Sequence, residues 1–329
     1  MSVPVTVYDH IRQNNVKTAL LIALFPVSLC ALFFGLSFAF YFWAYWDGAT
    51  TAGNALQQAF SPTLTAFVVF APALFIAALI WMIAAAFFGG SIMLSLAQAE
   101  PLSPEDARHR QVLRAVQNVA LAAGLPTPKA YVIADDSLNA FAAGYSPKTA
   151  SITLTSGMIK KLSPLELEGV IAHEMAHIGN RDVRLNMVVL IGLSISGLLA
   201  DMIGRAWLFS PRGRGGDREK NGITAIIFIA WLSLTIFNLL IAPLIFFAIS
   251  RTREYAADAT GALITRNPHA LANALQKISA DPRVEVLDAA PHMAAACIYT
   301  PRADVKPFLG IGDTHPAVSD RIRRLKAMG

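Results

Sequence analysis

The sequence predicts a mainly α-helical integral-membrane protein: an N-terminal transmembrane hairpin, then an α+β domain with a small sheet and two further hydrophobic helices. Three observations support this fold class. Of the 329 residues, 55% are hydrophobic and only 15% are charged, unlike an average soluble protein. Two long apolar runs lie near the N-terminus, and a strand-rich stretch follows them. We expect the hairpin to occupy residues 1–100 and the second domain 101–329, which hydrophobic helices interrupt at about 185–209 and 221–250.

The first apolar run predicts a transmembrane helix that stays attached to the chain. The 29 residues between Lys17 and Asp47 include no charge, and roughly 20 residues suffice to cross a bilayer. Tyrosine and tryptophan crowd its far end, where aromatic rings favour the membrane interface. The run is too long for a signal-peptide core and no small-residue cleavage site follows it, so we expect a retained anchor.

A second apolar run, residues 62–97, completes the hairpin, and the surrounding charges predict its orientation. Arg12 and Lys17 precede the hairpin, the connecting loop carries no cation, and three arginines follow between positions 108 and 114. Cytoplasmic loops carry an excess of lysine and arginine. Both flanks of the hairpin, and the domain after it, are therefore expected to face the cytoplasm.

Helix and strand signals alternate after the hairpin. Ser103 as N-cap and Pro104 in the first turn predict a helix that runs to about Gly124. Three β-rich runs separated by turn residues then predict a small sheet of about three strands. These runs are 130–133, 139–144 and 149–155. Ser163 and Glu166 have capping-box spacing, which predicts the start of the next helix.

The apolar segments 185–209 and 221–250 are candidate third and fourth spans. The first is short for a span, because only 16 uncharged residues separate Arg184 from Asp201. Asp201 and Arg205 are spaced i,i+4, however, and can neutralise each other within a helix. Two full crossings would place the basic loop 211–220 on the outer face, against the usual charge distribution. The alternative is that these segments are re-entrant, or wall a cavity without both crossing fully, and the sequence leaves both arrangements open.

The segment His173-Glu174-Met175-Ala176-His177 is the strongest chemical signal. Two histidines at i,i+4 share one helix face and can bind one zinc ion, with the glutamate beside it. A catalytic zinc has three protein ligands, so one more must come from elsewhere. Glu254 is the best candidate, near the start of an amphipathic helix expected over 251–279. Asp258 lies one turn further on. In the alternative without a functional role, Glu254 forms an ordinary ion pair with a neighbouring arginine and Asp258 is a solvated helix residue.

Together with the hairpin, these motifs resemble the HtpX-type family of membrane peptidases, gluzincins related to the CAAX prenyl proteases. The likeness spans nearly the whole chain. It implies one zinc ion per chain, held by His173, His177 and Glu254. It further implies that Glu174 is the general base and that Asp258 orients a ligand histidine through its other ring nitrogen.

The resemblance extends to a strand and to a C-terminal motif. The strand would pair with an extended substrate by β-addition, or is simply a strand that ends at glycine. Its residues are Asn139, Ala140, Phe141, Ala142 and Gly144. Ala143 stands where threonine is expected, a small departure. His315, with Arg321 supporting it in a short basic helix over 318–328, is expected to stabilise the oxyanion; a turn histidine before proline is the alternative.

The expected function is that of a zinc metalloendopeptidase, a hydrolase for misfolded or damaged proteins in membrane quality control and the stress response. The resemblance implies a multi-pass protein of the bacterial cytoplasmic membrane, with unfolded polypeptides and the lipid bilayer as partners. Nucleic acid is not expected, because the basic residues behind the net charge of +5 are dispersed. The alternatives are a CAAX-prenyl-type peptidase and a catalytically silent, zinc-bearing membrane chaperone or adaptor.

Overall fold

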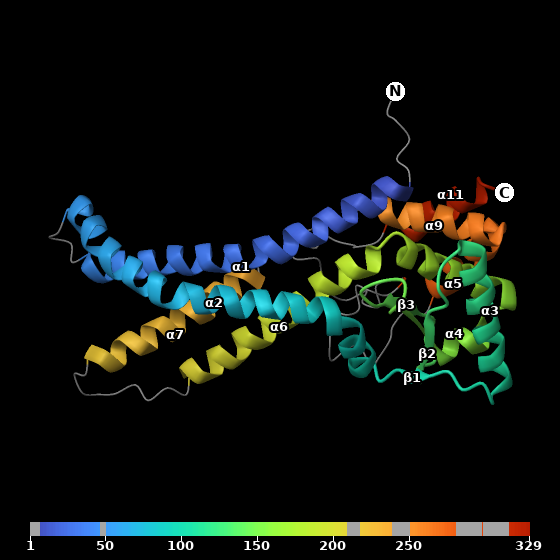
Figure 1. Cartoon of the computed structure of the whole chain (residues 1–329), viewed down its shortest axis with the longest axis horizontal. Helices are drawn as coiled ribbons and strands as arrows, with labels where there is room; N and C mark the ends of the chain where they lie inside the picture. The colour runs from blue at the N-terminus through green and yellow to red at the C-terminus, as the bar shows by residue number, and fades with distance from the viewer. Residues whose placement is uncertain (1–6, 47–50, 209–217, 239–250, 281–297, 299–315) are drawn as a thin grey trace, which may run out of the picture. The chain divides into compact units, whose positions relative to one another are not determined.

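A computed structural model describes residues 7–46, 51–208, 218–238, 251–280, 298 and 316–329. The chain divides into two compact units. The first unit comprises Met1–Thr18, Ala84–Ile191 and Phe246–Gly329, and the second comprises Ala19–Ile83 and Gly192–Ile245. Helices predominate in both, and the sheet belongs to the first unit (Figure 1). This arrangement confirms the predicted fold class.

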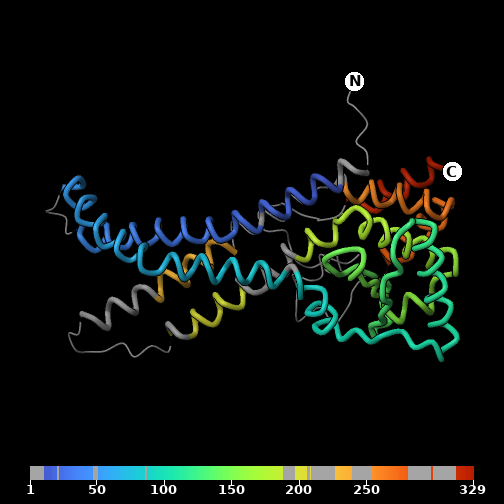
Figure 2. The backbone as a smooth tube through the Cα atoms, in the orientation of Figure 1, coloured from blue at the N-terminus to red at the C-terminus, as the bar shows by residue number. Residues whose placement is uncertain are grey.

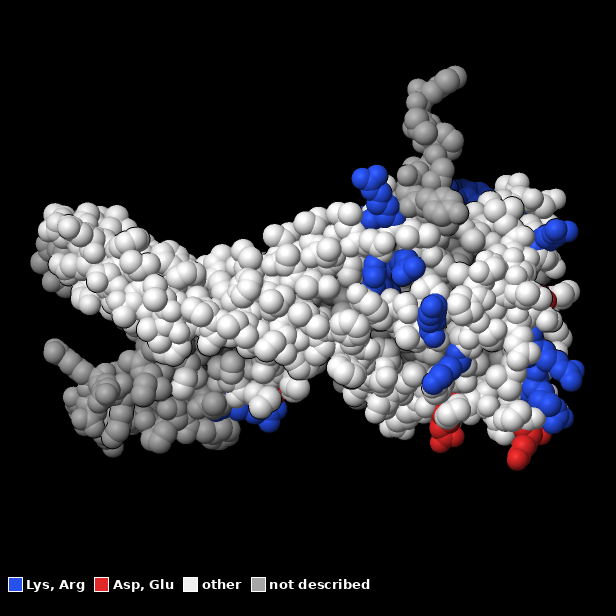
Figure 3. Space-filling view, viewed as in Figure 1, with Lys and Arg blue, Asp and Glu red and all other residues white. Residues whose placement is uncertain are grey.

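Two long helices form the predicted N-terminal hairpin: α1, Val7–Tyr45, and α2, Ala52–Leu96. Each contains a stretch long and apolar enough to cross a membrane, Ile11–Tyr45 and Ala52–Ala85. Within the second unit their aromatic rings meet edge to face, as Phe34 and Phe67 do with ring centroids 5.2 Å apart. On the face that Figure 3 shows, the helices of this unit are almost free of charged side chains. An uncharged helical surface of this length suits a lipid environment.

The third and fourth apolar segments form α6, Asp182–Leu208, and α7, Arg218–Ile236. Asp201 and Arg205 form the expected ion pair on α6, with a 2.9 Å separation. In the part of the chain that is described, only stretches of α1 and α2 meet the length and hydropathy of a full span, while α7 holds the shorter apolar stretch Ile227–Ile236. Residues 239–250 of the predicted fourth segment lie outside the described residues.

The sheet of the first unit has four strands in the order β1-β2-β4-β3. They are β1 Glu100–Pro101, β2 Lys129–Ile133, β3 Ala140–Ala143 and β4 Ser151–Thr155. β2 pairs with β4 in parallel, and the other two pairings are antiparallel. The prediction of about three strands missed β1, because two residues that include a proline show no strand pattern. The segment 139–144 is confirmed as a strand at the edge of the sheet.

Six helices lie wholly within the described part of the first unit, and two of them, α4 and α5, contact the sheet. They are α3 Ala107–Ala123, α4 Ser156–Lys161, α5 Pro164–Gly179, α9 Arg251–Thr265, α10 Pro268–Ile278 and α11 Val318–Lys326. α3 begins later than predicted. Asp106, not Ser103, is its N-cap, because the Asp106 carboxylate accepts hydrogen bonds from the backbone N–H groups of Arg108 and His109. Gly124 ends the helix as expected, with φ of 66°.

Two helices, rather than one, occupy the stretch predicted to be a single helix over 251–279. Asn267 caps α10 and Pro268 follows at its first turn, where proline is tolerated but cannot continue a preceding helix. The break lets α9 and α10 pack separately on α5 (Figure 2). Gly261 of α9 lies so close to α5 that a Cβ there would be 3.1 Å from the His173 backbone nitrogen. Absence of a side chain at Gly261 therefore lets α9 approach the histidine helix directly.

Candidate functional site

Helix α5 carries the histidine motif and has a well-fixed start. The Ser163 N–H donates to Glu166 Oε2 at 2.7 Å, and the Ser163 hydroxyl accepts from the Glu166 N–H at 3.4 Å, which confirms the capping box. Lys277 of α10 also pairs with Glu166 at 2.7 Å. The capped helix presents both motif histidines on one side, and His173 is fully buried.

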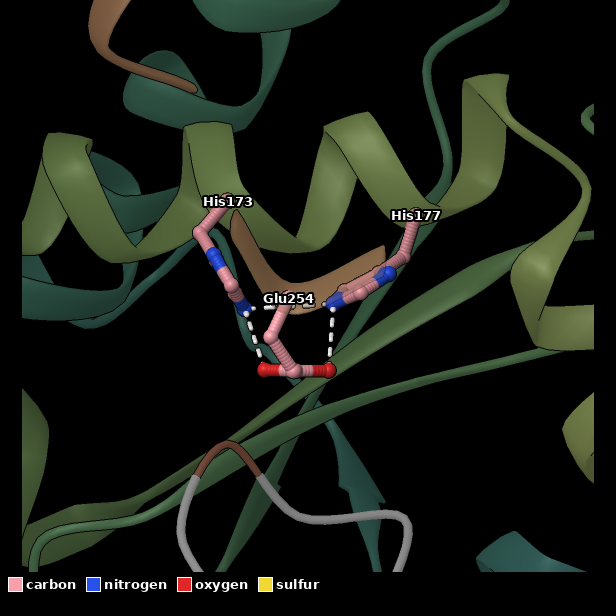
Figure 4. Close-up of side chains that lie close together, drawn as sticks. All are labelled: His173, His177 and Glu254. Atoms are coloured by element: carbon pink, nitrogen blue, oxygen red, sulfur yellow. Dashed lines mark hydrogen bonds and ion pairs between the residues drawn. The ribbon is translucent and has the colours of Figure 1, made fainter. Parts of the chain in front are cut away.

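His173, His177 and Glu254 form one cluster, although α5 and α9 are far apart in the sequence (Figure 4). One ligand atom from each residue lies within 4.8 Å of the others. The two Nε2 atoms are 3.2 Å apart. Glu254 Oε2 lies 3.8 Å from His173 Nε2, and Glu254 Oε1 lies 3.5 Å from His177 Nε2. Three donors thus converge on one small volume.

A carboxylate holds the outer nitrogen of each imidazole. Asp258 Oδ1 lies 3.0 Å from His173 Nδ1, and Asp182 Oδ2 lies 2.9 Å from His177 Nδ1. Because an ionised carboxylate can only accept, each Nδ1 carries a proton, and in a neutral imidazole this leaves the lone pair on Nε2. Two neutral imidazoles would face each other with lone pairs 3.2 Å apart, which repel unless a proton or a metal cation lies between them. The geometry is therefore that of a cation site.

The donor set fits zinc. Ligand bonds of about 2.0–2.1 Å in a tetrahedral site place the ligand atoms about 3.3 Å from one another, close to the spacing of the cluster. In the metal-free site, a proton on one of the two Nε2 atoms relieves this repulsion. Burial alone would lower the pKa of His177, but the Asp182 hydrogen bond and the charge of Glu254 outweigh it and raise that pKa to about 9.

Glu174 lies beside the cluster and is almost fully buried. Burial raises the pKa of its carboxyl to about 7, although the positive charge of His177 opposes that rise. The backbone N–H of Ala142 in β3 donates a hydrogen bond to this carboxylate. A carboxylate with a pKa near neutrality can both accept and release a proton under ordinary conditions.

Arg321 of α11 lies next to the metal-site cluster and is fully buried. It binds Asp258 through two hydrogen bonds, Nη2 to Oδ1 at 2.7 Å and Nε to Oδ2 at 2.8 Å, and its Nη1 lies 3.4 Å from Glu254 Oε2. Burial would raise the pKa of Asp258, but the Arg321 charge outweighs it and holds that pKa at about 2. Arg321 also donates to the carbonyl of Ile298 at 3.2 Å.

Comparison with known proteins gives the family. The sequence model of peptidase family M48 matches residues 106–329. The chain belongs to this family. A protein named Protease HtpX homolog from Bacteroides fragilis (strain YCH46) is 36% identical to this M48 chain over 320 residues, 95% of this chain and 96% of the relative. Another from Tropheryma whipplei (strain Twist) is 39% identical over 243 residues, 74% and 80% of the two chains.

Among solved structures, the crystal structure of S. mikatae Ste24p aligns with this M48 chain with a TM-score of 0.46 and 18% identity, over 97% of this chain and 67% of that one. The relatives confirm the predicted resemblance: the protein is an HtpX-like membrane metallopeptidase of family M48. M48 metallopeptidases depend on a metal ion, which agrees with the histidine and glutamate cluster.

The predicted substrate strand of this M48 peptidase adjoins the cluster. Its outward-facing backbone groups include the Ala142 N–H, which contacts Glu174, and the Ala140 carbonyl, which accepts from the Ile298 N–H at 2.8 Å. Phe141 is buried, and Asn139 Oδ1 accepts from the Ala140 N–H at 3.0 Å. Gly144 has φ of 132°, which only glycine adopts readily, and a Cβ there would lie 2.8 Å from the Thr149 carbonyl.

Sequence reasoning about this M48 peptidase missed Asp182 as the partner of His177. A residue five positions after a helical histidine does not normally face it. Here α5 ends at Gly179 with Asn180 as its C-cap, and Arg181 adopts a left-handed conformation with φ of 63°, which turns the chain back so that Asp182 meets His177. The signal present in the sequence was the short polar run directly after the motif. His315, the predicted oxyanion donor, lies outside the described residues.

Proposed function

We propose that this HtpX-like chain is a zinc metalloendopeptidase that hydrolyses peptide bonds of misfolded or damaged membrane proteins. The observation that carries the proposal is the cluster itself, two imidazole Nε2 atoms and a carboxylate within 4.8 Å of one another beside the buried Glu174. One zinc ion per chain would be held by His173, His177 and Glu254. Zinc bound there would supply Lewis-acid activation of water and of the scissile carbonyl.

In this proposal Glu174 is the general base. Its carboxylate takes a proton from the attacking water and later delivers it to the leaving amine. The pKa of about 7 supports both transfers, since the group is neither a strong acid nor permanently protonated near neutral pH. Asp258 and Asp182 keep the ligand histidines in the tautomer that binds metal. His315 would donate to the oxyanion, and the buried charge of Arg321 would support it.

The substrate is proposed to be an extended polypeptide that adds to β3. Such pairing uses backbone groups, so cleavage would depend weakly on sequence and strongly on local unfolding. The substrate would compete with the Ile298 N–H for the Ala140 carbonyl. Two apolar helices in the hairpin support membrane proteins as clients. The flanking charges support a cytoplasmic active site and N-terminus, in a multi-pass protein of the bacterial cytoplasmic membrane.

The test is proteolysis by the full-length, detergent-purified chain. An unfolded model protein should be cleaved, cleavage should stop with a zinc chelator, and it should return when zinc is added. Cleavage confined to a prenylated C-terminal peptide would instead favour the CAAX-type alternative. Bound zinc without cleavage of either substrate would favour the silent chaperone or adaptor.

Glu254→Gln should weaken zinc binding by roughly 100-fold or more, because loss of an outer-sphere partner alone weakens metal affinity by about 10–100-fold. The amide oxygen is a poorer ligand than the carboxylate and no longer offsets the charge of the ion. Competition with a chelating dye measures the effect. Glu168→Gln, a half-buried glutamate on α5, is the control and should bind zinc as the unaltered chain does. Equal affinity in both variants would remove Glu254 from the ligand set.

Zinc affinity should rise with pH. In the metal-free protein His177 has a pKa of about 9, so below pH 9 its Nε2 carries a proton that must leave before metal binds. Apparent affinity should then increase up to about tenfold per pH unit between pH 7 and pH 9, with release of about one proton. Calorimetry in two buffers with different ionisation enthalpies counts the protons. An affinity that does not change over this range would contradict the raised pKa.

A further inference from the structure

Asn14, on the first turns of the anchoring helix α1, touches the immediate surroundings of the metal site. Its side chain is 3% exposed. The Nδ2 group donates to Asp182 Oδ1 at 2.7 Å and to the carbonyl of Asn180 at 2.9 Å. Both amide hydrogens are therefore used, which fixes the orientation of the side chain. All of these residues belong to the first unit.

Asp182 is the residue through which this contact reaches the cluster. One carboxylate oxygen accepts from His177 Nδ1, and the other accepts from Asn14 and lies 3.4 Å from Arg253 Nη1. Asp182 is 1% exposed, so water cannot replace a lost donor easily. Because both carboxylate oxygens accept hydrogen bonds, rotation of the Asp182 carboxylate is restricted. Helices α1, α5 and α9 thus meet at a single side chain that holds a proposed zinc ligand.

We infer that Asn14 is a positioning residue for the metal centre: it holds Asp182, and through Asp182 it sets the orientation of the His177 imidazole. The inference rests on the proposed function, since it takes His177 to be a zinc ligand. α1 is one continuous helix from Val7 to Tyr45 and includes the first apolar stretch, so the anchor contributes a side chain to the support of the metal site. Neighbouring Asn15 accepts from Arg184, a second contact between α1 and the start of α6.

The test is zinc affinity of the full-length chain in detergent, measured by chelator competition, so it needs no substrate. Asn14→Leu keeps the approximate size and removes both donors. It should weaken zinc binding by about tenfold, the lower end of the effect of an outer-sphere partner. Gln13→Ala, the exposed neighbouring residue, is the control and should have no effect. Thermal melts accompany every variant, and Asn14→Ala replaces the leucine variant if that one fails to fold.

A double-mutant cycle separates positioning from a general structural role. If Asn14 acts through Asp182, Asn14→Leu should weaken zinc binding much less in an Asp182→Asn background than in the unaltered chain. Full additivity of the two effects, or unchanged affinity in Asn14→Leu, would overturn the inference alone. Unchanged affinity in His177→Ala would overturn the proposed ligand set, and this inference with it.

Discussion

Glu174→Gln is expected to abolish peptide hydrolysis while zinc stays bound. The amide has the shape of the carboxylate but cannot accept the proton of the attacking water, and general acid–base catalysis contributes about 10²–10⁴-fold to such reactions. The rate of cleavage of an unfolded protein should fall by at least the lower of these factors. Glu174 contacts the Ala142 N–H, which the amide oxygen can still accept, so folding should be preserved. Zinc content by mass spectrometry is measured on the same samples.

Glu168→Gln is the matched control for this experiment, because it makes the same chemical change on the same helix outside the cluster. It should cleave at the rate of the unaltered chain. Full activity in Glu174→Gln would refute the assignment of the general base. Loss of zinc together with activity would show that Glu174 stabilises the metal site, in which case the kinetic result says nothing about proton transfer.

Arg321→Ala is expected to destabilise the first unit severely. Arg321 is fully buried, and its removal leaves Asp258 buried without its two strongest hydrogen bonds. Loss of one partner from a buried ion pair costs about 3–5 kcal/mol. Thermal unfolding in detergent, followed by a dye that binds exposed apolar surface, should show a large fall in Tm. Zinc affinity should fall too, because Asp258 orients His173.

Arg323→Ala is the control, on the same helix. Its ion pair with Asp320 is exposed, so its loss should change the free energy of unfolding by no more than about 1 kcal/mol. Equal melting of the two arginine variants would contradict this account.

The buried pair of Arg321 and Asp258 also predicts a pH dependence of stability. The pKa of Asp258 is lowered to about 2, below its unfolded value of about 3.9, so its contribution is present above pH 4 and is lost as pH falls towards 2.

The sequence predicted the features that depend on local signals. A run of apolar residues identifies a hairpin helix by length alone, and Ser163 with Glu166 marks a helix start within one turn. The two motif histidines needed only the helical period to share a face. Glu254 was a different case: its place near a helix start made it the best candidate for the third ligand, but nothing local distinguishes a ligand from an ion-paired glutamate. The resemblance to a known family decided between the two.

Features that depend on tertiary contacts or on single backbone angles were missed. Asp182 reaches His177 only because Arg181 adopts a left-handed conformation, which no propensity predicts for arginine. Asn14 reads as one more polar residue before an apolar run, and its contacts lie more than 160 positions away. Arg321 was predicted to support His315 at the oxyanion, but its hydrogen bonds to Asp258 and its complete burial were not predicted.

The separation of the cluster in the sequence has a consequence for biosynthesis. His173 and His177 precede the apolar segments that begin with α6, and Glu254 follows them. When the chain has been synthesised only as far as the end of α5, it contains the histidine pair but neither Glu254 nor helix α9, which packs on α5. The nascent chain therefore cannot assemble the complete cluster until the later apolar segments have been synthesised. Assembly in this order would keep the enzyme from cutting polypeptides, itself included, while its own membrane insertion is still under way.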